Sequence, residues 1–180
     1  MKRLTLSSLA LVLVSSALPR TAAAQAAPSG VRGDMIAQID DAAGKIQQLA
    51  EAIPQDKYSW RPGAGVRSVS EAFMHVVGGN YYLMTFAGVT APAGTSEDMD
   101  KITDRAQVVD NLKRSFAHAR AAIAAASDAD LDKPTEMFGR KTTYRNVYLT
   151  EVAHAHEHLG QLIAYARMNG ITPPWSMPAR

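Results

Sequence analysis

The sequence predicts an all-α protein, a four-helix bundle. Four long segments repeat apolar residues at spacings of three and four, which is the pattern of an amphipathic helix. Connections of about 14 to 17 residues, rich in glycine, proline and polar residues, separate these segments. Only one short stretch favours strands. Four helices with one apolar stripe each bury those stripes by packing against one another, which is the bundle architecture.

The first two helices have clear signals at their ends. Residues 31–53 are predicted to form the first helix, which stops at Pro54 because proline cannot continue a helix. Residues 54–68 contain several glycine and proline residues and are predicted to be a loop. Ser68 or Ser70 is predicted to cap the second helix, which is expected to end near Gly88, and Ser68 with Glu71 fits a capping box.

The third and fourth helices are separated by a stretch without helical periodicity. The third helix begins near Thr103 or Asp104 and continues to an alanine-rich end. Residues 137–141, around Gly139, are predicted to form one small hairpin before the last helix. The fourth helix covers residues 144–169, and Gly170 followed by two prolines is a normal stop signal.

The N-terminus predicts export. Lys2 and Arg3 precede an apolar run that is too short to span a bilayer, and an A-x-A cleavage motif follows at residues 22–24. Residues 1–24 are therefore expected to be a secretory signal peptide, and residues 25–180 a single helical-bundle domain. The expected location is outside the cytoplasm, in the periplasm, and no segment is expected to span a membrane.

Charge and cysteine content exclude several classes of protein. The chain has 19 basic and 17 acidic residues, but Lys2, Arg3 and Arg20 lie in the expected leader, so the mature charge is about −1. Such a balance lacks the basic excess of a nucleic-acid-binding protein, and no nucleic-acid partner is expected. The chain contains no cysteine, so a metal site must be built from His, Asp, Glu or water.

The stretch HAHEHLGQ, residues 154–161, carries three histidines on the fourth helix. At about 100° per residue, His158 lies about 40° from His154, whereas His156 lies about 200° away. His154 and His158 therefore share a face and can bind one metal ion together. His75, in the apolar stretch AFMHVVGG, is the candidate third ligand, because a buried histidine needs a partner.

Neighbouring residues refine this hypothesis. Gly79, one turn after His75, lacks a side chain and is expected to leave space for a metal, a water or a substrate atom, with the Tyr82 hydroxyl at its edge. His118 and His156 are expected to lie on helix surfaces and are left out of the site. The alternative is that His75 is a hydrogen-bonded core residue and that HAHEH is a solvated polar face. The metalloprotease motif H-E-x-x-H is absent, because its second histidine position holds Gly160.

Two segments resemble the DinB-like superfamily of metal-binding four-helix bundles, which includes the YfiT-like proteins. One is HAHEHLGQLIAYARMNGITPPWS and the other is YSWRPGAGVRSVSEAFMHVVGGNYY. The resemblance implies a site in which His75, His154 and His158 bind a divalent metal ion and leave positions open for water. Zinc or nickel is expected first, with iron or manganese as alternatives. Studied members of the family include metal-dependent thiol transferases.

The expected activity is that of an exported metal-dependent hydrolase that uses metal-bound water on a small-molecule substrate of unknown identity. Glu151, Gln161 and Tyr82 are the candidate catalytic residues, because each lies near the face of the metal histidines; Glu157 is expected to be a surface charge. The first alternative is a metal-dependent thiol transferase. The second is a non-catalytic bundle that binds metal or a partner, and a homodimer is compatible with the alanine-rich third helix.

Overall fold

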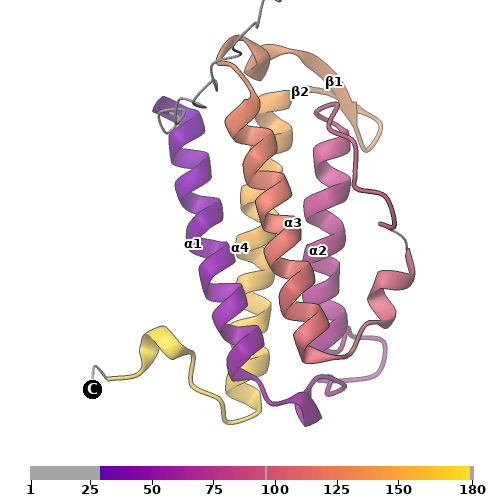
Figure 1. Ribbon diagram of the computed structural model, residues 1–180, viewed down its shortest axis with the longest axis vertical. Helices are drawn as coiled ribbons and strands as arrows, with labels where there is room; N and C mark the ends of the chain where they lie inside the picture. Colours follow the sequence, from indigo (N-terminus) through magenta and orange to yellow (C-terminus); the bar gives the residue numbers. More distant parts are fainter. Residues whose placement is uncertain (1–28, 96, 179–180) are drawn as a thin grey trace, which may run out of the picture.

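The computed structural model describes residues 29–95 and 97–178, and within them four long helices pack as a bundle (Figure 1). These helices are α1 (Gly30–Ala52), α2 (Val69–Thr85), α3 (Arg105–Ala125) and α4 (Tyr144–Met168). The predicted all-α bundle is confirmed, and most helix ends lie within two residues of the predicted ones. Helix α2 ends at Thr85, earlier than the predicted Gly88. The expected signal peptide lies outside the described residues.

The long connection between α2 and α3 sets the topology. Helix α1 packs against α3 and α4, and α2 also packs against α3 and α4. Helices α2 and α3 run in the same direction, so the connection between them travels the length of the bundle (Figure 1). This connection contains the short 3₁₀ helix η2 (Glu97–Lys101), which packs against α2. The sequence predicted an exposed connection here and did not predict the 3₁₀ turn.

The start of α2 has the predicted capping box. The backbone N–H of Glu71 donates to Ser68 Oγ (3.3 Å), and the backbone N–H of Ser68 donates to Glu71 Oε2 (2.7 Å). These two bonds satisfy backbone donors that have no partner within the helix. They fix the first turn of the helix that carries His75.

The predicted hairpin is present but is longer than residues 137–141. Strand β1 (Pro134–Met137) pairs antiparallel with β2 (Arg140–Thr143). The two residues of the turn, Phe138 and Gly139, both have positive φ (52° and 74°), as in a type I′ turn. The Thr135 hydroxyl donates to the carbonyl oxygen of Phe86 (2.7 Å), which holds the hairpin against the end of α2.

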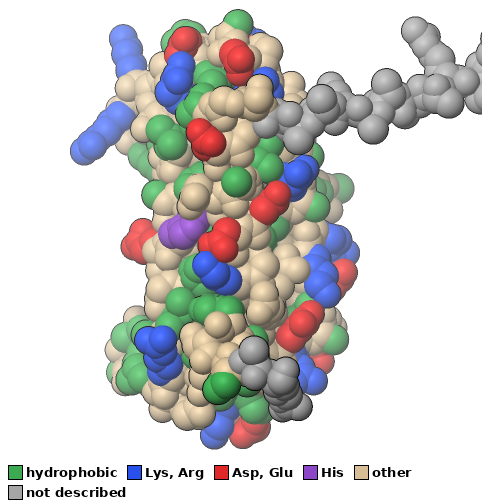
Figure 2. Space-filling view, turned by 90° about the vertical axis from the view of Figure 1, so that its left-hand side faces the viewer, with side chains coloured by type: hydrophobic (Ala, Val, Ile, Leu, Met, Phe, Trp, Pro, Cys, Tyr) green, Lys and Arg blue, Asp and Glu red, His purple; other side chains and the backbone are tan. Residues whose placement is uncertain are grey.

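All four helices contribute to one apolar core. On the face drawn in Figure 2, basic and acidic side chains are interspersed and do not gather into a patch of one sign. No helix among residues 29–95 and 97–178 combines the length and apolar character needed to cross a membrane. The largest fully buried side chains are Tyr58, Tyr148, Phe73, Ile39, Ile46, Leu49, Ile53, Met74, Met84, Leu112, Ile123 and Leu131.

Candidate metal centre

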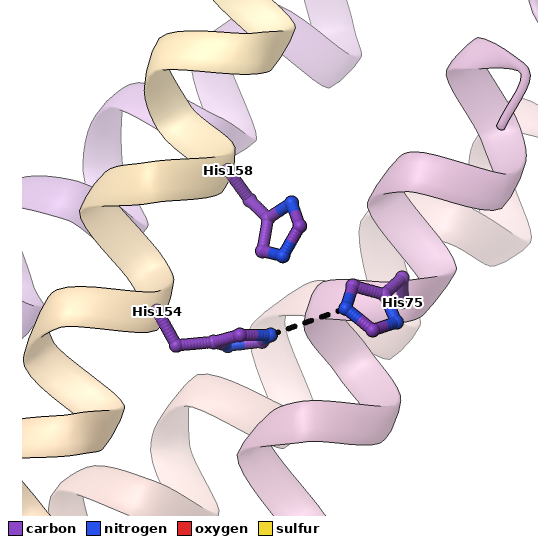
Figure 3. Close-up of side chains that lie close together, drawn as sticks. All are labelled: His75, His154 and His158. Atoms are coloured by element: carbon purple, nitrogen blue, oxygen red, sulfur yellow. Dashed lines mark hydrogen bonds between the residues drawn. The ribbon is translucent and has the colours of Figure 1, made fainter. Parts of the chain in front are cut away.

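Three half-buried histidines from two helices meet at one point. His154 and His158 on α4 and His75 on α2 direct their rings toward one another (Figure 3). One ring nitrogen from each lies within 4.8 Å of the others, and Nε2 of His154 is 3.3 Å from Nε2 of His75. The structure therefore brings together the three histidines that the sequence singled out. Within the described part of the chain, no Asp or Glu joins this cluster.

Gly79 allows α2 and α4 to approach closely enough for the cluster to form. A Cβ atom at position 79 would lie 2.9 Å from both ring nitrogens of His154, and closer still to its Cε1. Any side chain there would collide with the imidazole. The sequence suggested that Gly79 leaves space for a metal, a water or a substrate; in the structure the His154 ring itself fills that space.

A chain of hydrogen bonds orients His158. Its Nδ1 lies 2.8 Å from Oε1 of Gln161, and Nε2 of Gln161 donates to the Tyr165 hydroxyl (2.9 Å). That hydroxyl donates in turn to the backbone carbonyl of Arg67 (3.2 Å), just before α2. Because an amide oxygen only accepts, His158 carries a proton on Nδ1, and in the neutral imidazole this leaves the lone pair on Nε2. Gln161 thus bonds to a histidine of the cluster, as the sequence suggested.

The surroundings keep two of the imidazoles neutral. Burial, together with the neighbouring His158 and His75, lowers the pKa of His154 to about 4. Burial also lowers the pKa of His75, and the charge of Arg67 acts in the same direction. Metal ions bind the neutral form of histidine. These pKa shifts leave the ring nitrogens available as ligands near neutral pH.

The cluster fits a divalent transition-metal ion. With metal–nitrogen bonds of about 2.1 Å, two nitrogen ligands of a tetrahedral centre lie roughly 3.4 Å apart, close to the 3.3 Å between His154 and His75. Three neutral nitrogen donors suit zinc and nickel, and also iron and manganese. His154 Nδ1 is buried and has no hydrogen-bond partner. No hydrogen bond at this nitrogen therefore orients the His154 ring, whereas Gln161 orients His158.

Glu151, a candidate catalytic residue, lies inside the bundle one turn before His154. Its side chain is fully buried, and burial raises the pKa of its carboxyl group to about 8. The side-chain amide of Asn80 is oriented so that its nitrogen donates to Glu151 Oε1 (2.7 Å) and its oxygen accepts from the Ser115 hydroxyl (3.0 Å). Glu151 Oε2 is buried without a partner. Glu151 is thus part of a buried polar group that joins α2, α3 and α4.

Tyr82 and the three side chains that the sequence analysis left out of the site lie nearer the surface. Tyr82 is 56% exposed and stands beside the rings of Phe86 and Phe138. Glu157 is exposed, as expected for a surface charge. His156 points away from the cluster and bonds through Nδ1 to the carbonyl oxygen of Val152 (2.9 Å). His118 lies half-buried on α3, with its ring against Tyr81.

A cavity of about 830 Å³ opens beside the histidines. His75 and His154 line it, together with residues from α2, from the connection that contains η2, and from the hairpin turn. The sequence analysis identified only some of the residues that line this cavity. Phe138, Met99 and Asp100 were not predicted to lie near the site, and the only signal for Phe138 was its place next to Gly139 in the expected hairpin.

Comparison with known proteins identifies a family. The model of the DinB superfamily matches residues 38–162, more than two thirds of the chain. The Bacillus subtilis (strain 168) protein YjoA, described as uncharacterized, is 29% identical over 129 residues, which cover 69% of this chain and 82% of YjoA.

Two solved structures share the fold. One is a DinB-like protein from Bacillus cereus ATCC 10987, with a TM-score of 0.70 and 18% identity, over 80% of this chain and 95% of that one. The other is the DinB-like protein YjoA from Bacillus subtilis, with a TM-score of 0.63 and 21% identity, over 81% of this chain and 96% of that one. At these identities the likeness concerns the fold alone.

Proposed function

This chain belongs to the DinB superfamily, and from that premise we propose that it is a metal-dependent hydrolase that binds one divalent ion through His75, His154 and His158. The observation that carries the proposal is the position of the three-histidine cluster at the wall of a large cavity. A closed structural site would have a fourth protein ligand, whereas this cluster consists of three histidines. Three protein ligands beside a cavity are the arrangement of a catalytic site.

A divalent ion held by His75, His154 and His158 would supply Lewis acidity, which makes water a nucleophile near neutral pH. The residues of the chain position the ligand histidines and the substrate. Gln161 holds His158 in one tautomer, and Gly79 lets His154 lie against α2. Tyr82 stands at the cavity wall, where its hydroxyl can bond a polar group of the substrate.

Glu151 is assigned a supporting role. It is buried beside Asn80, away from the lining of the cavity, and no hydrogen bond joins it to a histidine of the cluster. We therefore place it in the framework that holds α2 against α4. Of the candidate catalytic residues, Tyr82 is the one that lines the cavity, and Gln161 is the one that contacts a proposed ligand.

The proposal includes export, as the N-terminal sequence suggests. Export favours hydrolysis over thiol transfer, because a hydrolase needs only water as its second reactant, whereas free thiol cofactors are scarce outside the cytoplasm. Sequencing the N-terminus of the protein recovered from its native cell tests this part. A first residue at or near Gln25 supports export, and a chain that still begins at Met1 contradicts it.

Metal content measured by mass spectrometry tests the site. The wild type, His75→Ala, His154→Ala, His158→Ala and the control His156→Ala are purified without a histidine tag and compared. We expect about one ion per chain in the wild type and in His156→Ala, and loss of the ion in the other three variants. Retention of the ion by His75→Ala would overturn the three-histidine site.

Activity is then measured on a panel of esters, amides and lactones. Hydrolysis that requires the ion and disappears in His154→Ala supports the proposal. Activity that appears only when a low-molecular-weight thiol is added supports the transferase alternative. Metal binding without either activity supports the non-catalytic alternative.

A further inference from the structure

The cavity beside the histidines has a mostly apolar lining. Leu83, Met99, Tyr82 and Phe138 contribute apolar surface. Its volume of about 830 Å³ lies within the roughly 300 to 1,000 Å³ that is typical of sites for small organic molecules. The polar side chains of its lining are few, with the histidines on one wall and Asp100 and Thr95 on the connection that contains η2. The cavity therefore favours a ligand that is largely apolar.

Phe138 occupies a position that neither turn chemistry nor burial explains. It has a φ of 52°, in the left-handed region that phenylalanine rarely adopts, and its side chain is 62% exposed. The first position of such a turn normally holds Asn, Asp or Gly. The Phe138 ring stands 5.2 Å from the ring of Phe86 and 6.2 Å from that of Tyr82, between centroids. An exposed aromatic side chain in a strained conformation at a cavity wall is the pattern of a binding residue.

Gly78 is a second residue that local rules do not explain. It lies in the middle of α2, where alanine would stabilise the helix more than glycine does, and it does not have a positive φ. A Cβ atom at position 78 would meet no other atom within 4 Å, so packing does not require glycine there, in contrast to Gly79. Gly78 lines the cavity, and the missing side chain enlarges it.

We propose that this cavity binds an uncharged aryl or branched alkyl group of the substrate, and that Phe138 is the main determinant of this preference. The proposal deepens the proposed function and rests on it for the reaction: the rings of Phe138 and Tyr82 hold the apolar group while the polar end of the same molecule reaches His75 and His154. Asp100 also lines the cavity, and its carboxylate disfavours an anionic ligand because like charges repel.

Binding of N-phenyl-1-naphthylamine tests the inference. This uncharged aryl amine fluoresces when it enters apolar surroundings, and it needs no metal. We compare the metal-free wild type with Phe138→Asn, which suits the turn but removes the ring, and with Gly78→Leu, which suits the helix but fills the cavity. Trp175→Ala is the control, because Trp175 is an exposed aromatic residue outside the cavity lining.

We expect the wild type to bind the probe and both cavity variants to bind it about tenfold more weakly, while their melting temperatures stay equal to or above that of the wild type. Trp175→Ala should bind within about twofold of the wild type. The inference is wrong if the wild type does not bind the probe, if either cavity variant binds as the wild type does, or if the control loses as much affinity.

This experiment is independent of the metal measurement. If the probe binds as expected but the protein takes up no metal, the hydrolase proposal fails and the apolar binding site stands. If metal binds but the probe does not, the three-histidine site stands and the substrate class is wrong.

Discussion

The imidazole of His154 lies against the backbone of Gly79, in the volume that any side chain at position 79 would occupy. The two residues come from antiparallel neighbouring helices, α4 and α2. The close contact exists because one of them has no side chain. The distance between His154 and His75 therefore depends on a residue that offers no ligand atom.

Gly79→Ala should weaken metal binding about 10- to 100-fold, because the new methyl group must displace the His154 ring. Isothermal titration with zinc measures the effect. Gly78→Ala is the matched control, since it makes the same change one residue earlier in the same helix, where a Cβ meets no atom within 4 Å. Equal affinities in the two variants would contradict the role assigned to the close contact.

Gln161→Leu should also weaken metal binding about 10- to 100-fold, because it removes the acceptor that orients His158. Gln161→Glu keeps an acceptor oxygen at the same place and should retain most of the affinity. Competition with a chelating dye provides the dissociation constants. If the leucine variant binds metal as tightly as the glutamate variant does, the hydrogen bond does not support the site.

Glu151 should make the metal-free protein less stable as the pH rises. The folded carboxyl group has a pKa of about 8, against an ordinary value of 4.5, so the folded state keeps a proton that the unfolded state releases. The stabilisation is complete below about pH 4.5 and is lost as the pH rises through about 8. At about 1.4 kcal/mol per pKa unit, the loss is of the order of 5 kcal/mol.

The variant Glu151→Gln isolates this effect, because the glutamine side chain does not ionise. Burial of His154 acts in the opposite direction, adding stability as the pH rises from about 4 to 6.5, and it does so in both proteins. Urea unfolding between pH 5 and pH 8.5 should show the wild type losing stability relative to the glutamine variant. Parallel curves would mean that Glu151 is ionised in the folded protein.

Ser68→Ala should lower the free energy of unfolding by about 1 kcal/mol, because Ser68 caps the start of α2. Ser59→Ala, at an exposed serine in the preceding loop, is the control and should change stability by less than about 0.5 kcal/mol. Urea unfolding measures both. A loss of stability in the control that equals the loss in Ser68→Ala would show that the cap contributes little.

Local signals predicted most of the fold. The helices were predictable because apolar spacing, the Ser68 cap and the Gly170 stop act over a few residues. The three histidines were predictable for a related reason: His154 and His158 are one turn apart on one helix, and His75 is a polar residue in an otherwise apolar stretch. The hairpin was predicted too short, because the sequence marks its turn more strongly than its strands.

The cavity was not predictable, because it depends on contacts between distant segments. The connection that contains η2 brings Met99 and Asp100 beside α2, and nothing in its own sequence indicates that path. The role of Gly79 was predicted only in part for the same reason: Gly79 does line the cavity, but the His154 ring lies where its Cβ would be. Whether a missing side chain leaves space or is filled depends on the partner helix, and here the partner supplies His154.

The two helices that share the histidines are far apart along the chain, since His75 and His154 are separated by 79 positions. An ion held between them would act as a removable cross-link, comparable to a disulfide that closes a very long loop. It would bind the folded chain and not the unfolded one, so resistance to unfolding would increase with the free metal concentration. The lifetime of the protein would then depend on how much metal its surroundings provide.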